Sequence, residues 1–525
     1  MTPLARRGAG APPQFHLPSH LLLAAILVGA LLLRVYDLQP YAWVPDQYDR
    51  LADAKLIASG HLPQSRIYPP GGALVFALPV GFVSNSLLTL QAVTVGFGVA
   101  LVCLAYFATW HATRDRLAAV LAAGGCAVLP MFVYLARSGA LDIAIVFLIA
   151  LSVFLLPALR GRPLGWFAAC GALLALLVSI RLTNAVLVVP LVIYWLALSE
   201  TGFDPRRMIG AVTARGVLVA AATFVGLMLP SLFVGRWYAT GSDGVVTFDS
   251  VLANLSVFAK YALVWPLTPL VVPAAAFGFR RLWQMDRPLS LAIAALTILW
   301  PLSYAPFYFT SWRYAAPVTF FVLFLASVGW ASLLATAGQP EGRIRKGARL
   351  LAGGSLACFA LFLVTSSMMV TARWPTYAAE SDAGLAREVA PVLDGLDETS
   401  LVVSAVARAF AAEETPVAFL DVMELSLATN DSDATTTTVV GAIQEALAGG
   451  RDVYFLFSNF EADRKKFGRP SDNFRFYFEE VQKSFALTEV FRTKLAHDGR
   501  LPWVLYRIEQ GPPPDDLAGL SREQD

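Results

Sequence analysis

Charged residues are scarce in this chain of 525 residues. Only 15% are Asp, Glu, Lys or Arg, while 57% are hydrophobic. In a water-soluble domain, roughly a quarter of all residues are charged. The mean hydropathy of +0.59 therefore predicts that much of the apolar surface faces membrane lipid. The net charge of +2 gives no sign of a nucleic-acid partner.

Cysteine and histidine are also rare. The four cysteines, Cys103, Cys126, Cys170 and Cys358, all lie in apolar runs. Neither a disulfide framework nor a cysteine-based metal site is predicted from them. The five histidines show no metal-ligand spacing, and no phosphate-binding loop, haem or flavin motif is found. We therefore expect no cofactor, and a divalent metal is not supported.

Charges are sparse before about residue 372 and dense after it. We therefore expect a membrane domain over residues 1–371 and a soluble domain over residues 372–512. A helix needs about 17 to 25 apolar residues to cross a bilayer, and about eleven segments meet this length. They are residues 18–35, 86–110, 117–136, 142–159, 164–180, 182–199, 216–235, 260–279, 288–311, 314–336 and 350–372.

The direction of these spans follows from their basic loops. Residues 71–84 are too short to cross, so we interpret them as a segment that dips into the membrane. Every inner loop is then rich in Arg or Lys, which satisfies the positive-inside rule. The expected result is an integral protein of the cell (inner) membrane with its N-terminus in the cytoplasm, its first helix retained and its C-terminal domain outside.

The soluble portion alternates strand-like and helix-like runs. The runs SLVVSAVA, PVAFLDV, DVYFLFSN and PWVLYRI are typical of strands, whereas TTTVVGAIQEALAGG and FYFEEVQKSFAL are typical of helices. This alternation predicts a small α/β domain. The closing residues 513–525, rich in Pro and charge, are expected to be disordered.

The first outer loop carries the densest set of polar residues. Asp46 follows Pro45 at an expected helix start, and Asp49 and Asp53 recur three and seven residues later. This spacing places three carboxylates near one helical face. The alternative is that Asp46 only caps the helix and that the other two lie on a solvated face.

Further ionisable residues stand at outer helix ends. Asp142 begins the fourth expected span beside Arg137, Arg181 occupies a tight turn, and Arg313 with Tyr314 opens a later span. Helix capping and snorkelling at the membrane surface are the alternative roles. The topology nevertheless places one whole set on the same membrane face: Asp46, Arg66, Arg137, Asp142, Arg181, Lys260 and Arg313.

The outer location limits the chemistry. The outer side has no nucleotide pool, and the inner loops are too short to fold a nucleotide-binding domain, so a nucleotide sugar is excluded as the direct donor. A sugar on a polyprenyl phosphate is available there. Its transfer needs a base for the acceptor hydroxyl and cations for the departing phosphate. One carboxylate and two or three arginines are sufficient.

Several short motifs occur in a familiar order. They are Val-Pro-Asp-Gln at 44–47, Tyr-Pro-Pro-Gly at 68–71, the turn Ala-Arg-Ser-Gly-Ala-Leu-Asp at 136–142, and Arg-Tyr-Ala-Ala-Pro at 313–317. In this order they resemble the GT-C membrane glycosyltransferases, family 39-like, of the protein-mannosyltransferase and aminoarabinose-transferase type. The resemblance covers roughly residues 18–336.

The resemblance implies a GT-C-like fold, a polyprenyl-phosphate-sugar donor and inversion at the anomeric carbon. It makes Asp46 the catalytic base and gives Asp142 a role in positioning the base or the acceptor. It makes four arginines candidates for the donor phosphate: Arg66, Arg137, Arg181 and Arg313. Asp49, Tyr68, Lys260 and Tyr314 are secondary or acceptor-side candidates.

Two departures from the family pattern matter. Gln47 stands where many relatives have Glu, which argues against a metal, and Tyr68 stands where many have Lys. The Trp-Trp-Asp motif of oligosaccharyltransferases is absent, so we expect transfer of a single sugar, mannose or a related one, to a lipid, glycan or protein acceptor. A lipid-linked-glycan flippase or transporter and a membrane-anchored sensor or assembly scaffold are the alternative functions.

Overall fold

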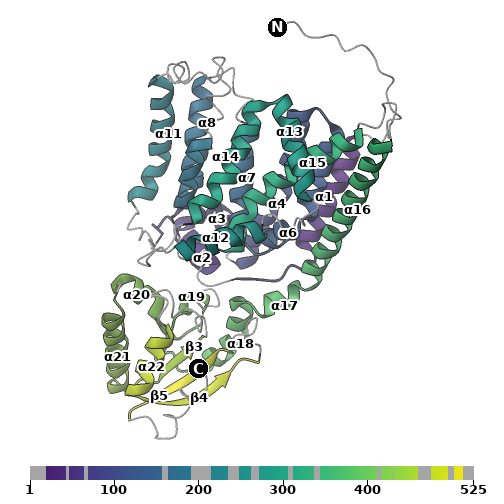
Figure 1. The fold of residues 1–525 in the computed structure, drawn as a ribbon. Helices are drawn as coiled ribbons and strands as arrows, with labels where there is room; N and C mark the ends of the chain where they lie inside the picture. The colour runs from purple at the N-terminus through teal and green to yellow at the C-terminus, as the bar shows by residue number, and fades with distance from the viewer. Residues whose placement is uncertain are drawn as a thin grey trace.

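The computed structural model describes most of the chain. The described residues are 19–42, 46–63, 69–84, 86–155, 163–190, 214–233, 248–261, 271–305, 311–335, 343–410, 415–429, 431–458, 474–494 and 502–511. They form a helix bundle and a smaller α/β domain below it (Figure 1). The tail over residues 513–525, which was expected to be disordered, lies outside the described residues.

The helix bundle contains long apolar helices and shorter connecting ones. They are α1 (Ser19–Val35), α2 (Asp46–Ala58), α3 (Gly71–Phe82), α4 (Leu87–Thr113), α5 (Arg116–Val128), α6 (Pro130–Arg137), α7 (Asp142–Leu155), α8 (Pro163–Ile180), η2 (Leu182–Leu187), α11 (Ala214–Phe233), α12 (Phe248–Ala259), α13 (Val271–Met285), α14 (Arg287–Tyr304), η4 (Trp312–Ala315), α15 (Ala316–Ala335) and α16 (Arg343–Ala372). Most coincide with the expected spans.

Within the described residues, three helical stretches are long and apolar enough to cross a membrane, namely 87–113, 312–335 and 350–372. The pair α5 and α6, bent by 52°, makes a fourth if it is one span. The count of about eleven therefore stays a prediction. The expected span over 260–279 differs, because α12 ends at Ala259, α13 begins at Val271, and residues 262–270 lie outside the described part. Helix α3 is a separate helix of 12 residues, about 18 Å long, which is less than a bilayer core of about 30 Å.

The bend between α5 and α6 is held by side chains from other helices. Pro130 lacks an N–H, so the carbonyls at the end of α5 lose their helical partners. Arg34 of α1, which is completely buried, donates to the carbonyl oxygens of Ala127 at 2.9 Å and Cys126 at 3.1 Å. Ser367 of α16 donates to the next carbonyl, that of Val128. Polar groups left without partners in an apolar bundle are costly, so these contacts stabilise the bend.

The C-terminal domain, which was expected to be soluble and is called the soluble domain below, contains a five-stranded sheet in the order β2-β1-β3-β5-β4. Its elements are α17 (Trp374–Ala379), α18 (Asp382–Asp394), β1 (Leu401–Ser404), α19 (Ala407–Phe410), β2 (Ala418–Asp421), α20 (Val422–Thr429), α21 (Ser432–Ala448), β3 (Val453–Phe457), α22 (Phe474–Ser484), β4 (Ala486–Arg492) and β5 (Val504–Glu509). Strand β1 is parallel to β2 and β3, and β5 is antiparallel to β3 and β4. The α/β prediction is thus correct.

The soluble domain packs against the segment that leads into α2. The backbone N–H of Asp382 donates to the carbonyl oxygen of Ala42 at 3.1 Å, and Trp374 donates to that of Gln39 at 3.4 Å. Helix α19 contacts α2, and Phe410 and Trp503 belong to the same apolar core as the helix bundle. The soluble domain is therefore joined to one end of the bundle through an apolar contact.

Candidate functional site

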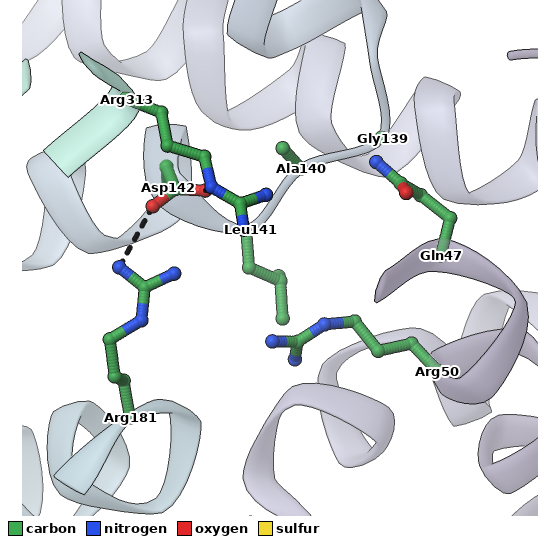
Figure 2. A pocket seen from close by; sticks show the side chains of 8 residues that line it. All are labelled: Gln47, Arg50, Gly139, Ala140, Leu141, Asp142, Arg181 and Arg313. Atoms are coloured by element: carbon green, nitrogen blue, oxygen red, sulfur yellow. Dashed lines mark ion pairs between the residues drawn. The ribbon is translucent and has the colours of Figure 1, made fainter. Parts of the chain in front are cut away.

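Four separate segments meet in a small cavity at the end of the bundle that faces the soluble domain. It is lined by Gln47 and Arg50 of α2, residues 139–142 between α6 and α7, Arg181 after α8, and Arg313 in η4. Figure 2 shows the polar side chains pointing toward one another. The cavity volume is about 10 Å³, room for about one water molecule.

The turn before α7 is fixed by side chains from α2 and α4. Gly139 has a φ of +71°, a conformation that favours glycine. Gln47 donates to the carbonyl oxygen of Ser138 at 3.0 Å, and Gln91 donates to that of Arg137. These contacts place Asp142, the first residue of α7, at the cavity wall.

Asp142 is the centre of the charge arrangement. Its Oδ1 lies 2.9 Å from Nη1 of Arg181, and its Oδ2 lies 3.9 Å from Nε of Arg313. The carboxylate side chain is 6% exposed, whereas Arg181 is 19% and Arg313 is 24% exposed. One carboxylate thus lies between two arginines that still reach solvent.

Both arginines make cation–π contacts with one tyrosine ring. The guanidinium of Arg181 lies 4.4 Å from the ring centroid of Tyr314, and that of Arg313 lies 5.4 Å from the same ring. Tyr314 stacks on Tyr304 at 4.8 Å, whose hydroxyl is 2.7 Å from that of Thr183. The cation–π contacts hold the guanidinium planes in place without consuming their N–H donors.

Arg50 is the third arginine that lines the cavity, and it lies close to the start of α3. A Cβ added to Gly72 would lie 1.8 Å from Nη1 of Arg50 and 2.8 Å from Cδ1 of Leu141. Only glycine therefore leaves room for the guanidinium at this position. Gly72, which follows the Tyr-Pro-Pro-Gly motif, thus makes room for an arginine that lines the cavity.

The structure brings together part of the predicted set. Asp142, Arg181 and Arg313 line the cavity, and Tyr314 supports both arginines. Helix α2 begins at Asp46 as expected, but the side chain of Asp46 lies outside the described residues, as do the whole of Arg66 and Tyr68.

Other predicted residues lie elsewhere. Arg137 is fully buried, and its two Nη atoms donate to the carbonyl oxygens of Leu33, Tyr36 and Asp37 while its guanidinium covers the ring of Trp374. It contacts the end of α1 and the residues just after it instead of the cavity.

Lys260 is exposed and lies 5.3 Å from the ring of Tyr261, outside the cavity lining. Asp49 and Asp53 are 1% and 4% exposed, so the alternative of a solvated helix face is wrong. Neither carboxylate lines the cavity. Among the described residues, no three His, Cys, Asp or Glu side chains lie together as a metal site requires.

The sequence interpretation missed Arg50, Gln47 and Gly72 as site residues. Arg50 lies four residues after Asp46 in an expected helix, which places both near one helical face. This spacing was the available signal for Arg50. The contact with Gly72 depends on how α2 packs on α3, which no local pattern contains.

Comparison with known proteins shows which solved structures have a similar fold. No protein-family model and no curated protein sequence matches the chain. The crystal structure of ArnT from Cupriavidus metallidurans bound to undecaprenyl phosphate matches with a TM-score of 0.58 at 15% identity, covering 94% of this chain and 99% of ArnT. The chain has the ArnT fold. The apo structure of ArnT matches with a TM-score of 0.59, again at 15% identity, covering 94% of this chain and 98% of ArnT. The resemblance to the aminoarabinose-transferase type is thus confirmed at the level of the fold.

Proposed function

We propose that this protein is a membrane glycosyltransferase that moves a single sugar from a polyprenyl-phosphate carrier to an acceptor hydroxyl on the outer face of the membrane. The observation that carries the proposal is the cavity lined by Arg50, Arg181 and Arg313 together with the carboxylate of Asp142. The ArnT fold supports the class of donor, because one ArnT structure holds undecaprenyl phosphate.

The cavity suits an anion. Its lining has three arginines and one aspartate, so positively charged groups predominate around it. Guanidinium groups bind phosphate oxygens through paired N–H donors. We therefore assign Arg50, Arg181 and Arg313 to the carrier phosphate, and Arg66 remains a predicted member of this group.

The transfer step follows from these assignments. Asp46, at the start of the helix that carries Arg50, takes the proton of the acceptor hydroxyl. The hydroxyl oxygen attacks the anomeric carbon from the side opposite the phosphate, and the bond between this carbon and the phosphate oxygen breaks. The arginines stabilise the negative charge that develops on the departing prenyl phosphate. The configuration at the anomeric carbon is inverted.

The basic residues support an outer location for the site. Helix α14 begins at Arg287 and ends at Tyr304, which stacks on Tyr314 at the site end. Arg287, Arg280 and Arg281 therefore lie at the opposite end of the bundle. An excess of Arg at this end favours a cytoplasmic position for it, which supports an outer position for the cavity and the soluble domain.

The experiment uses the purified full chain in lipid nanodiscs with a panel of undecaprenyl-phosphate-linked sugars. Release of undecaprenyl phosphate and appearance of a glycosylated acceptor are measured by mass spectrometry, with acceptors drawn from the envelope of a deletion strain. The wild type should turn over at least one donor. Asp46→Asn should abolish transfer without loss of folded protein. Near wild-type turnover by this variant would show that the base is assigned to the wrong residue.

A further inference from the structure

Asp142 occupies the position that an anionic ligand of the two arginines would need. Its two carboxylate oxygens face different guanidinium groups, Oδ1 toward Arg181 and Oδ2 toward Arg313 (Figure 2). A phosphate group presents oxygens to arginine in the same manner as a carboxylate. The protein's own side chain is therefore bound where a phosphate would be attracted.

The two arginines are held unequally. Arg181 lies within hydrogen-bond distance of the carboxylate at 2.9 Å, closer to the Tyr314 ring, and near the Tyr304 hydroxyl at 3.5 Å. Arg313 approaches the carboxylate only to 3.9 Å and lies farther from the same ring. Hydrogen bonding weakens beyond about 3.2 Å, so Arg313 leaves Asp142 at lower cost than Arg181 does.

The size of the cavity requires such a movement. A volume of about 10 Å³ holds about one water molecule, and a phosphate group is larger. Full entry of a phosphate between the arginines therefore displaces at least one lining side chain. Arg313 is more exposed than Arg181 and lies farther from the carboxylate of Asp142, so Arg313 is the arginine of this pair that moves.

We infer that Asp142 is an internal counterion that competes with the carrier phosphate: Arg313 turns from Asp142 to the phosphate when the donor binds, and its return to Asp142 displaces the prenyl phosphate product. This inference rests on the proposed function. Arg181 stays paired with Asp142 throughout and keeps it in position. Asp142 then lowers the affinity for the product and so speeds its release.

The test measures the binding of undecaprenyl phosphate to the full chain in phosphatidylcholine nanodiscs by native mass spectrometry. Asp142→Asn removes the competing charge with little change in shape. It should bind undecaprenyl phosphate more tightly by about tenfold or more, within the range of coupling between two sites. Undecaprenol, which lacks the phosphate, should bind wild type and variant equally. Asp433→Asn, at an exposed position of the soluble domain, removes one charge far from the cavity and should leave the affinity unchanged.

A second variant covers the case in which Asp142→Asn does not fold because two arginines are left without their counterion. The double change Asp142→Asn with Arg181→Gln removes one charge of each sign, and it should bind undecaprenyl phosphate more tightly than Arg181→Gln alone, which keeps the competing carboxylate. The counterion role would be overturned if Asp142→Asn bound no more tightly than the wild type or, where Asp142→Asn does not fold, if the double variant bound no more tightly than Arg181→Gln, while the wild type still binds. Absence of binding in the wild type and the variants alike would overturn the proposed function as well.

Discussion

Replacement of Gly72 by alanine tests the position of Arg50 without touching the arginine itself. The added methyl group would lie 1.8 Å from Nη1 of Arg50 and 2.8 Å from Cδ1 of Leu141. Both atoms are the ends of side chains that can turn away. Gly72 lies in the first turn of α3, where alanine is the better helix former by about 0.5–1 kcal/mol. We therefore expect the helix to persist and the guanidinium to move.

The size of the effect follows from the distance. Real Cβ atoms do not approach other heavy atoms within 3.0 Å, so Nη1 must retreat by more than about 1 Å. A misplacement of about 1 Å in a catalytic group can cost about 100-fold in rate. Turnover of a carrier-linked sugar should therefore fall by about 10-fold to 100-fold. The free energy of unfolding should change by less than about 1 kcal/mol, since the gain in helix propensity offsets the loss of contacts.

The assay pairs release of undecaprenyl phosphate with thermal unfolding, both in the same nanodiscs. Gly96→Ala in α4 is the matched control, because a Cβ there meets no atom within 4 Å, and it should keep both activity and stability. Gly71→Ala should lose folded protein instead, because its Cβ would lie 2.7 Å from the backbone carbon of Ser179. Wild-type turnover by Gly72→Ala would refute the assignment of Arg50. Unfolding as severe as that of Gly71→Ala would show that Gly72 serves helix packing.

Two further variants test the bundle that carries the site. Arg34→Met leaves the two carbonyls at the bend between α5 and α6 unpaired in apolar surroundings, which should lower the free energy of unfolding by about 2–4 kcal/mol; an unchanged melting temperature would contradict the bracing role. Gly278→Val should yield almost no folded protein in size-exclusion chromatography, because its Cβ would lie within 2 Å of a backbone oxygen of α15, whereas Gly353→Ala, with no atom within 4 Å, should elute as the wild type does.

The helices could be predicted because lipid imposes a length and an apolar composition on each of them. The expected spans over 18–35, 164–180 and 314–336 agree with α1, α8 and α15 within a few residues. The segment 117–136 was expected to form one span, and it contains two helices, α5 and α6, that meet at Pro130 with a bend of 52°. The sequence contains the proline, whereas the stabilisation of the bend depends on side chains from α1 and α16.

Prediction from the sequence was also incomplete for the strands of the soluble domain. Four of its five strands lie, to within one residue, inside the runs predicted as strands, but β4 was missed. The helix-like run FYFEEVQKSFAL was expected to continue to residue 487, whereas α22 ends at Ser484 and β4 begins at Ala486. Its pairing with β5 is a long-range contact that overrides the local pattern.

The expected membrane topology predicted three residues of the site. Successive helices that cross a membrane run in opposite directions, so the end of one helix and the start of the next lie on the same face. Asp142, Arg181 and Arg313 are far apart in the chain and stand at such ends, and the structure brings them together. Sidedness does not fix the direction of a side chain. Arg137 is five residues from Asp142, yet the turn at Gly139 sends its guanidinium toward Leu33 and away from the cavity.

The group that each guanidinium contacts distinguishes two kinds of arginine in the helix bundle. Arg34 and Arg137 are fully buried and donate to backbone carbonyls, which cannot move away or find other donors, so exchange of these bonds for a ligand would leave polar groups unpaired. Arg181 and Arg313 face a carboxylate at a cavity that reaches solvent. A carboxylate can be hydrated, or can keep one arginine while it releases the other, so these bonds can be exchanged for a phosphate. Residue type and topology alone do not distinguish the two kinds, because the distinction depends on which acceptor each guanidinium meets.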